Sequence, residues 1–215
     1  YLGQQDNINH FYKLLPAFKD QRYMTVDGRI LFLIYRPLHF DGVKEFIKDW
    51  RTLAIQNKLR GFYFVGQLGQ LGKDPSQEDI DKVISFGFDG INIVRLWSAL
   101  AKRSFFEKAA DKLYSVITGI PRIAKYKNIY PYFLGKEELQ NNIYPTLIPN
   151  WDHTPRSGCN GYVLTNSTPE LFRSHVSNVL DSTLKKKQED RIVFLKSWNE
   201  WGEGNYMEPD LKFGK

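Results

Sequence analysis

Apolar residues along this chain form short continuous runs that alternate with stretches of helical spacing. The runs predict buried strands at residues 29–35, 61–65, 88–94, 144–149 and 191–196. The helical spacing predicts helices at residues 7–18, about 41–58, 78–85 and 169–189, and an interrupted helical region at 99–127. Strands that alternate with amphipathic helices are typical of parallel sheets with helical crossovers, so the expected class is α/β.

Conspicuous polar and aromatic residues follow these strands. They are Tyr35, Arg36 and His39 after the first strand, Trp97 after the third, Trp151, Asp152 and Arg156 after the fourth, and residues 198–206 after the fifth. Side chains gathered at the carboxyl ends of parallel strands are typical of (β/α)8 barrels and of doubly wound sheets. Because no Gly-rich phosphate-binding fingerprint follows a strand, we expect a TIM-type (β/α)8 barrel. Five strands instead of eight predict that residues 1–215 form a single domain, the C-terminal part of a barrel whose missing N-terminal segment supplies the first strands.

The segment at residues 198–208 has the sequence WNEWGEGNYME and carries two glutamates three positions apart. If the loop makes a helical turn, Glu200 and Glu203 share one face and can reach one sugar. Paired acids can protonate a leaving oxygen and assist attack at the anomeric carbon, and neighbouring carboxyl groups favour one protonated and one ionised partner. Trp198 and Trp201 offer flat surfaces that stack on pyranose rings. The segment therefore predicts a carbohydrate-active enzyme with Glu200 and Glu203 as catalytic residues.

Other residues of this segment and of the fourth strand's loop are candidates for substrate binding. Asn199 could hold a hydroxyl or orient Glu200, or it could be a turn residue. Asn205 and Tyr206 could extend the sugar subsite or merely close the turn. Trp151 could be a stacking platform, with Asp152 and Arg156 as a hydroxyl clamp. Alternatively, Asp152 and Arg156 form a pair that braces the loop.

Residues after the first and third strands are further candidates. Arg36 could hold a carboxylate or phosphate and His39 a hydroxyl, beside Tyr35; a structural role is the alternative for His39. Trp97 could stack on a sugar ring. The four histidines and the single cysteine, Cys159, show no ligand spacing, so neither a metal nor a cofactor is expected.

Composition and charge bear on the core, the partners and the location of the protein. An aromatic content of 15 % suits either a large aromatic core or a groove that stacks sugar rings. The net charge of +6 is dispersed, and its densest run, at residues 185–187, falls at a predicted helix end, where cations suit the helix dipole, so nucleic acid is not an expected partner. Cys159 excludes an internal disulfide and fits a reducing, cytoplasmic location. No apolar run approaches the roughly 20 residues that span a bilayer.

The motif WNEWGEGNYMEPD at residues 198–210 resembles the signature of the WbsX-type glycosyltransferases, proteins of bacterial cell-surface polysaccharide and lipopolysaccharide biosynthesis with a glycoside hydrolase family 99-like domain. Two further segments fit the same family: residues 18–23 together with 26–37, and NWDHTPR at 150–156. The resemblance implies a (β/α)8 fold and activity on glycans. Related endo-mannosidases carry their catalytic acids in a Glu-Trp-His-Glu-Gly motif, which matches residues 200–204 with glycine in place of histidine. By this similarity Glu203 is the general acid and Glu200 the general base.

Three functions compete at this point. The first is an enzyme that transfers or hydrolyses glycosidic bonds, with a glycan or sugar donor as its partner. The second is a glycan-binding module that keeps the aromatic groove and does no chemistry. The third is a sugar-nucleotide transferase, which the missing phosphate-binding loop disfavours.

Overall fold

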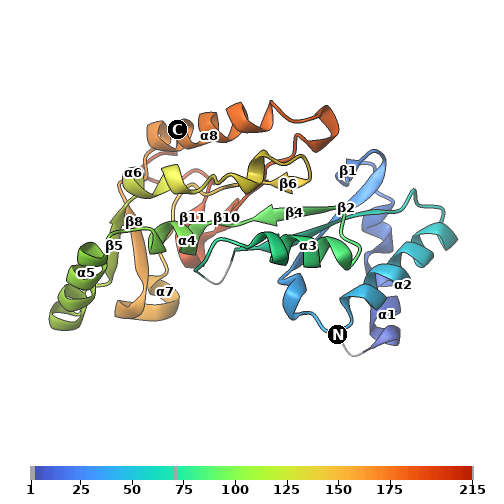
Figure 1. Cartoon of the computed structure of the whole chain (residues 1–215), viewed down its shortest axis with the longest axis horizontal. Helices are drawn as coiled ribbons and strands as arrows, with labels where there is room; N and C mark the ends of the chain where they lie inside the picture. The colour runs from blue at the N-terminus through green and yellow to red at the C-terminus, as the bar shows by residue number, and fades with distance from the viewer. Residues whose placement is uncertain (1–2, 70–71, 215) are drawn as a thin grey trace. The chain divides into compact units, whose positions relative to one another are not determined.

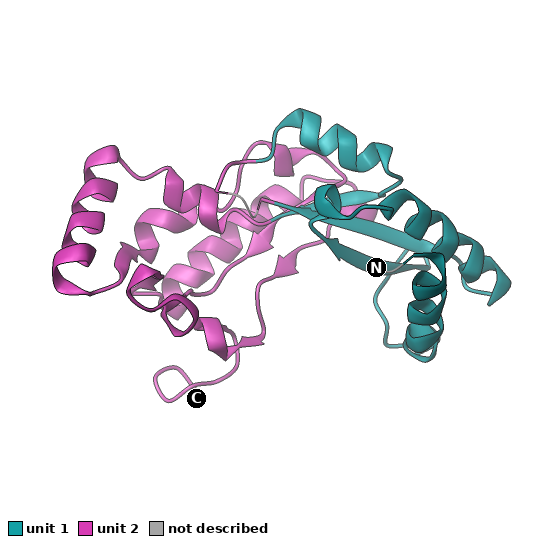
Figure 2. Cartoon of the chain, turned by 90° about the horizontal axis from the view of Figure 1, so that it is seen from below, with its two compact units in different colours: residues 1–68, 75–93 teal, residues 69–74, 94–215 magenta. Residues whose placement is uncertain are grey.

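The computed structural model describes residues 3–69 and 72–214 and has a mixed α/β fold (Figure 1). The chain folds into two compact units (Figure 2). Unit 1 comprises Tyr1–Leu68 and Pro75–Ile93, and unit 2 comprises Gly69–Asp74 and Val94–Lys215. The predicted α/β class is confirmed, whereas a closed eight-stranded barrel stays a prediction.

Unit 1 is built on a sheet with the strand order β1-β2-β3-β4. Its strands are β1 (Thr25–Val26), β2 (Arg29–Tyr35), β3 (Phe62–Leu68) and β4 (Gly90–Ile93). Its helices are α1 (Gln4–Phe18), α2 (Val43–Gln56) and α3 (Gln77–Ser85), with a 3-10 turn, η1, at Pro37–His39. The pairs β2–β3 and β3–β4 are parallel, with α2 and α3 as their connections. The predicted strand–helix alternation is therefore confirmed in this unit.

The core of unit 1 is largely aromatic. Trp50 of α2 is fully buried, and its ring centroid lies 4.7 Å from that of Phe32, 4.4 Å from Phe46 and 5.7 Å from Phe11. The indole N–H of Trp50 donates a hydrogen bond of 3.0 Å to the backbone carbonyl of Asn7, which satisfies its one polar atom. In this unit the aromatic residues therefore serve the core, one of the two roles that the composition allows.

Unit 2 contains shorter elements. Its helices are α4 (Leu96–Ala101), α5 (Phe105–Thr118), α6 (Tyr126–Ile129), α7 (Thr154–Ser157) and α8 (Pro169–Thr183). Its strands are β5 (Arg122–Lys125), β6 (Ile143–Tyr144), β7 (Thr146–Leu147), β8 (Tyr162–Thr165), β9 (Phe194–Leu195), β10 (Asn199–Glu200) and β11 (Asn205–Tyr206). Strands β5 and β8 pair in parallel, as do β7 and β9. A core cluster that includes Leu96, Tyr126, Ile148 and Leu164 joins β5 and β8 to α4 and α6.

Several predicted boundaries in unit 2 are wrong. Residues 122–125 form strand β5, because the helical pattern ends at Gly119 and Pro121 and the chain then pairs with β8. Helix α8 ends at Thr183, so residues 185–187 are not its last turn. Lys186 is buried, and its ammonium donates to the carbonyl of Ile143 and lies 5.6 Å from the Tyr144 ring centroid. Lys186, the middle residue of the lysine run at 185–187, therefore has a structural role.

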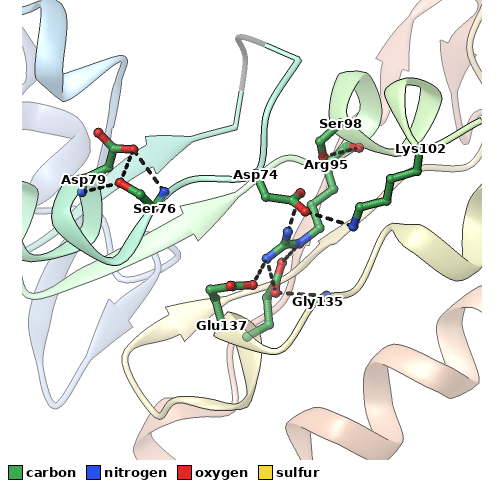
Figure 3. A network of polar contacts seen from close by, with 9 residues as sticks. Asp74, Ser76, Asp79, Arg95, Ser98, Lys102, Gly135 and Glu137 are labelled. Carbon is green, nitrogen blue, oxygen red and sulfur yellow. Dashed lines mark hydrogen bonds and ion pairs between the residues drawn. The ribbon is translucent and has the colours of Figure 1, made fainter.

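Arg95, the second residue after β4, is buried among carboxylates (Figure 3). Its Nε and Nη2 donate to Glu138 at 2.6 and 2.7 Å, and Nη2 donates to Glu137 at 2.6 Å. Its Nη1 lies 2.5 Å from Asp74. Burial alone would lower the pKa of Arg95, but Glu138, Asp74 and Glu137 raise it above its ordinary value. A Cβ at Gly135 would overlap the Arg95 guanidinium, so glycine is needed beside it.

Removing one charge from this cluster should destabilise the protein strongly. Glu138 is fully buried, so Glu138→Gln leaves part of the Arg95 charge without compensation and should lower the unfolding free energy by about 3 kcal/mol. Urea denaturation measures this loss. The exposed pair Asp20–Arg22 supplies the control, because Asp20→Asn should change stability little. An equal effect of the two substitutions would contradict the structural role of the cluster.

Because of His175 in α8, the unfolding free energy should depend on pH in the acidic range. The ring is 1 % exposed, and burial lowers its pKa to about 4. Its Nε2 accepts a hydrogen bond of 3.3 Å from the amide of Ile148. Because the unfolded chain protonates this ring near pH 6.5 and the folded chain only near pH 4, the unfolding free energy should fall as pH drops through this window, at up to about 1.4 kcal/mol per pH unit.

The variant His175→Gln should lose that contribution to the slope between pH 6.5 and 4. The exposed His39 carries the matched control, since His39→Gln should keep the wild-type slope. Urea titrations at several pH values give both slopes, and a wild-type slope in His175→Gln would contradict the assignment.

Candidate functional site

The predicted catalytic segment forms a tight hairpin in unit 2. Strand β10 pairs antiparallel with β11, with Asn199 opposite Tyr206 and Glu200 opposite Asn205, and the 3-10 turn η6 (Trp201–Glu203) joins them. The Ser197 hydroxyl accepts a hydrogen bond from the amide of Glu200 at 3.2 Å and donates to the carbonyl of Asn205 at 2.7 Å. The hydroxyl therefore ties the two strands together at the base of the hairpin.

The hairpin rests on the loop that follows β7. The Asn205 side chain, fully buried, donates to the backbone carbonyl of Asn150, and the side chain of Asn150 accepts from the amide of Tyr206 at 3.0 Å. The amide of Asp152 donates to the carbonyl of Glu203 at 2.7 Å. Because β7 and β9 are parallel, their carboxyl ends bring these two loops to the same place. Asn205 therefore has a structural role in the turn, one of the two roles expected for it.

Arg156 of α7 contacts both candidate catalytic carboxylates. Its Nε lies 3.2 Å from Glu203 Oε1, and its Nη2 lies 3.5 Å from Glu200 Oε1. Lys196 adds a second cation at 3.7 Å from Glu203 Oε2. The Glu203 side chain is 12 % exposed and that of Glu200 is 39 % exposed. The structure thus brings Glu200, Glu203 and Arg156 together, and the alternative brace between Asp152 and Arg156 is not the observed arrangement.

Aromatic rings of the hairpin stack on each other. The rings of Trp201 and Tyr206 are 3.7 Å apart and inclined by 14°. The Trp201 indole N–H donates to Glu208 at 2.6 Å, and the Tyr206 hydroxyl donates to Asp210 at 2.9 Å. Trp198 is more than half exposed, and its backbone carbonyl accepts from the amide of Glu208 at 3.2 Å. Both tryptophans therefore keep a surface open to solvent.

The Trp151 loop packs against Trp97. Trp151 is buried, with Trp97 edge-on at 6.0 Å between ring centroids and His153 stacked at 5.6 Å. The Lys196 ammonium lies 4.8 Å from the Trp151 ring centroid. The Asp152 carboxylate accepts hydrogen bonds from the amide and hydroxyl of Thr154, at 2.9 and 2.5 Å, which starts α7 and so positions Arg156.

A cavity of about 500 Å³ lies beside the hairpin. Its lining includes the predicted binding residues Trp151, Asp152 and Tyr206, together with Phe172 and Asn166. Among the described residues, neither Glu200 nor Glu203 is part of that lining. The cavity therefore adjoins the hairpin through Tyr206 and Gly204, away from the two carboxylates.

The remaining predicted residues belong to unit 1. Tyr35 ends β2 and is more than half exposed, and the Arg36 guanidinium lies 5.1 Å from its ring centroid. Arg36 has a left-handed backbone with φ 51°, and His39 ends the turn η1. That these three residues contact the same substrate as the glutamates stays a prediction.

Sequence reasoning assigned no role to three residues that hold the site together, although Asn150 was part of the family segment at 150–156. Lys196 and Ser197 directly follow β9, and Asn150 follows the β7 segment, so all three stand at strand ends, where functional residues gather. Their position was a usable signal. Their hydrogen-bond partners could not be predicted from the sequence. The bonds of Asn150, for example, depend on the packing of two loops that are more than 45 residues apart in the chain. Across residues 3–69 and 72–214, His, Cys, Asp and Glu side chains form no group of three that could hold a metal ion.

The model of the family described as "Glycosyltransferase WbsX" matches residues 1–215. The chain belongs to the WbsX glycosyltransferase family. This confirms the resemblance carried by the hairpin and by the Asn150–Arg156 segment. Among curated relatives, two proteins named WxcX and described as uncharacterised, from Xanthomonas campestris pv. campestris strains B100 and ATCC 33913, are each 23 % identical over 210 residues. The match covers 97 % of this chain and 28 % of each relative.

A solved structure described as a glycoside hydrolase-like protein has the same fold as this WbsX-family chain. The TM-score is 0.59 at 16 % identity, and the match covers 95 % of this chain and 53 % of the other. The chain thus spans about half of that protein and less than a third of the WxcX relatives. In the described part of the chain, no helix is both long and apolar enough to cross a bilayer.

Gly204 should be essential for seating the hairpin. Its φ of 51° is left-handed, and a Cβ there would lie 2.7 Å from the Asp152 Cβ. Gly204→Ala should therefore add a steric clash to the roughly 1 kcal/mol of backbone strain and lower the unfolding free energy by more than that amount.

Gly119 provides the matched control for this substitution. It is also left-handed, with φ 68°, and a Cβ there would meet nothing within 4 Å. Gly119→Ala should lower the unfolding free energy only by the roughly 1 kcal/mol that the left-handed backbone costs a residue other than glycine. Chemical denaturation of both variants gives the difference, and equal losses would show that the close approach to Asp152 is unimportant.

Proposed function

We propose that this WbsX-family chain is part of an enzyme that acts on glycosidic bonds of a polysaccharide, by transfer or hydrolysis, with Glu200 and Glu203 as its catalytic pair. The contact of one guanidinium, that of Arg156, with both carboxylates carries the proposal. Two neighbouring acids are the groups that glycosidic chemistry uses, and the exposed rings of Trp198 and Trp201 beside them suit a sugar substrate.

The two acids have different surroundings. Glu203 is mostly buried, and the cations of Arg156 and Lys196 lie beside it. Glu200 is more exposed and has a single, longer contact, with Arg156. By the family similarity, we propose Glu203 as the general acid and Glu200 as the general base.

The cavity beside the hairpin is proposed to bind a neutral sugar residue. Asp152, Glu208 and Asp210 contribute three carboxylates to its lining, against the single cation of Lys212. Carboxylates accept hydrogen bonds from sugar hydroxyls and repel phosphates and uronic acids. The rings of Phe172 and Tyr206 offer apolar faces. This composition argues against a nucleotide diphosphate at this place.

The family similarity also suggests the fold and the pathway of the whole protein. We propose that the whole protein forms a (β/α)8 barrel whose N-terminal strands come from a segment outside these 215 residues. Tyr35, Arg36, His39, Trp97 and Asn199 are proposed to bind the substrate. We propose a cytoplasmic role in the biosynthesis of bacterial cell-surface polysaccharide.

A glycan-binding module without catalysis is the alternative. The observation that favours it is the separation of the cavity lining from Glu200 and Glu203. Such a module would bind neutral oligosaccharides on a glycan array, release no product, and be indifferent to a change at either glutamate.

Replacement of each glutamate by glutamine in the full-length protein tests the catalytic proposal. Glu200→Gln and Glu203→Gln should each lower kcat for glycan transfer or cleavage by about 100-fold or more, because each removes an acid–base step. The exposed Glu189 supplies the control, since Glu189→Gln should keep wild-type turnover. A substrate with a good leaving group should restore turnover in Glu203→Gln and not in Glu200→Gln. Unchanged turnover in both site variants would exclude the catalytic role and leave the binding module.

A further inference from the structure

The loop of residues 166–168 joins β8 to α8 and belongs to the lining of the cavity beside the hairpin (Figure 1). Two of its three polar side chains serve the fold. The Ser167 hydroxyl donates to a backbone carbonyl of β8 at 3.4 Å, and the Thr168 hydroxyl caps α8 by accepting from an amide of its first turn at 3.4 Å. The third, Asn166, is exposed, and its carboxamide has no hydrogen-bond partner among the described residues.

The backbone of Asn166 is left-handed, with φ 58°. This conformation strains residues other than glycine, although asparagine tolerates it better than most. A turn with no further role would be served best by glycine. An asparagine in this conformation beside a cavity therefore indicates that its side chain is needed there.

The carboxamide of Asn166 supplies what the other polar groups of the cavity lack. The carboxylates of Asp152, Glu208 and Asp210 can only accept hydrogen bonds while they are ionised, and the Lys212 ammonium can only donate them. A carboxamide both donates and accepts, as a sugar hydroxyl does. Asn166 is therefore suited to pair with an uncharged hydroxyl.

Asn150, whose carboxamide also belongs to the lining, is held by the hairpin. Its side-chain oxygen accepts from the amide of Tyr206 at 3.0 Å, and its backbone carbonyl accepts from the side chain of Asn205. These bonds fix Asn150 in the fold, whereas Asn166 has no comparable contact among the described residues.

The end of β8 runs beside the segment that carries Asp152. Asp152 lies opposite Val163 in an antiparallel bridge, and the amide of Leu164 donates to the carbonyl of Trp151 at 2.8 Å. Because the two segments run in opposite directions, Asp152 and Asn166 reach the cavity from different ends of this pairing. A ligand in the cavity can therefore meet a carboxylate at one end and a carboxamide at the other.

We propose, on the basis of the sugar site proposed above, that Asn166 is a specificity-determining residue of this cavity. Its amide nitrogen donates to a hydroxyl oxygen of a neutral sugar, and its amide oxygen accepts the proton of a hydroxyl. Asp152 accepts from a second hydroxyl, and the ring of Phe172 packs on an apolar face of the sugar. The carboxamide thereby selects a sugar that carries a free hydroxyl at this position.

Binding of the full-length protein to an array of neutral oligosaccharides tests this role. Asn166→Gly keeps the left-handed turn and removes the carboxamide. It should weaken binding of the oligosaccharide that the wild type binds best by roughly fivefold to tenfold, measured by calorimetry. In thermal unfolding it should be at least as stable as the wild type, because glycine is unstrained at this φ. Asn166→Asp, which loses the donor and adds a carboxylate, should weaken binding at least as much.

Lys58 provides the matched control. It is also exposed and left-handed, with φ 62°, and it belongs to unit 1. Lys58→Gly should be at least as stable as the wild type and should bind the same oligosaccharide with wild-type affinity. The catalytic pair is tested separately, by the turnover of Glu200→Gln and Glu203→Gln.

Two results would overturn the proposal. One is equal affinity of the wild type, Asn166→Gly and Asn166→Asp for the oligosaccharide, which would make Asn166 a turn residue and leave the proposed sugar site intact. The other is the absence of binding to every neutral oligosaccharide of the array by the folded full-length protein. That outcome would remove the sugar site itself, whereas a loss of turnover in the glutamine variants would still support the catalytic pair.

Discussion

The candidate site depends on how the hairpin of residues 199–206 is seated on the loop of residues 150–152. Asn205, buried and bonded to the Asn150 carbonyl, fixes one strand, and the bond from the Asp152 amide to Glu203 fixes the turn. Parallel pairing of β7 with β9 brings the two loops together. Without these contacts the orientation of Glu200 and Glu203 toward Arg156 would not be determined.

The strands and helices of unit 1 could be predicted from the sequence, because its strands are continuous apolar runs and its helices have regular apolar spacing. Strand β2 begins and ends as predicted, since its apolar run has the length of a strand and lies between Gly28 and Pro37. Unit 2 is harder because its strands are two to four residues long and their pairing sets their ends. Residues 122–125 have no strand signal of their own and become β5 only through pairing with β8.

The site was predictable in its residue types and less so in its contacts. The pair Glu200 and Glu203 with nearby tryptophans is visible in the sequence, and Arg156 was expected to bind substrate. Its contact with both glutamates required the turn at Thr154 that Asp152 begins. Lys196 escaped attention because a lysine at the end of a strand normally indicates a solvated terminus, whereas here its ammonium lies beside Glu203 and over Trp151.

A crystal structure of the full-length protein with a bound substrate oligosaccharide gives the most direct test of the central claim, that Arg156 holds Glu200 and Glu203 at one reacting centre. The account predicts a glycosidic oxygen within hydrogen-bonding distance of one glutamate, the anomeric carbon facing the other, and Arg156 still in contact with both. A sugar chain whose scissile bond lies away from both carboxylates would contradict it.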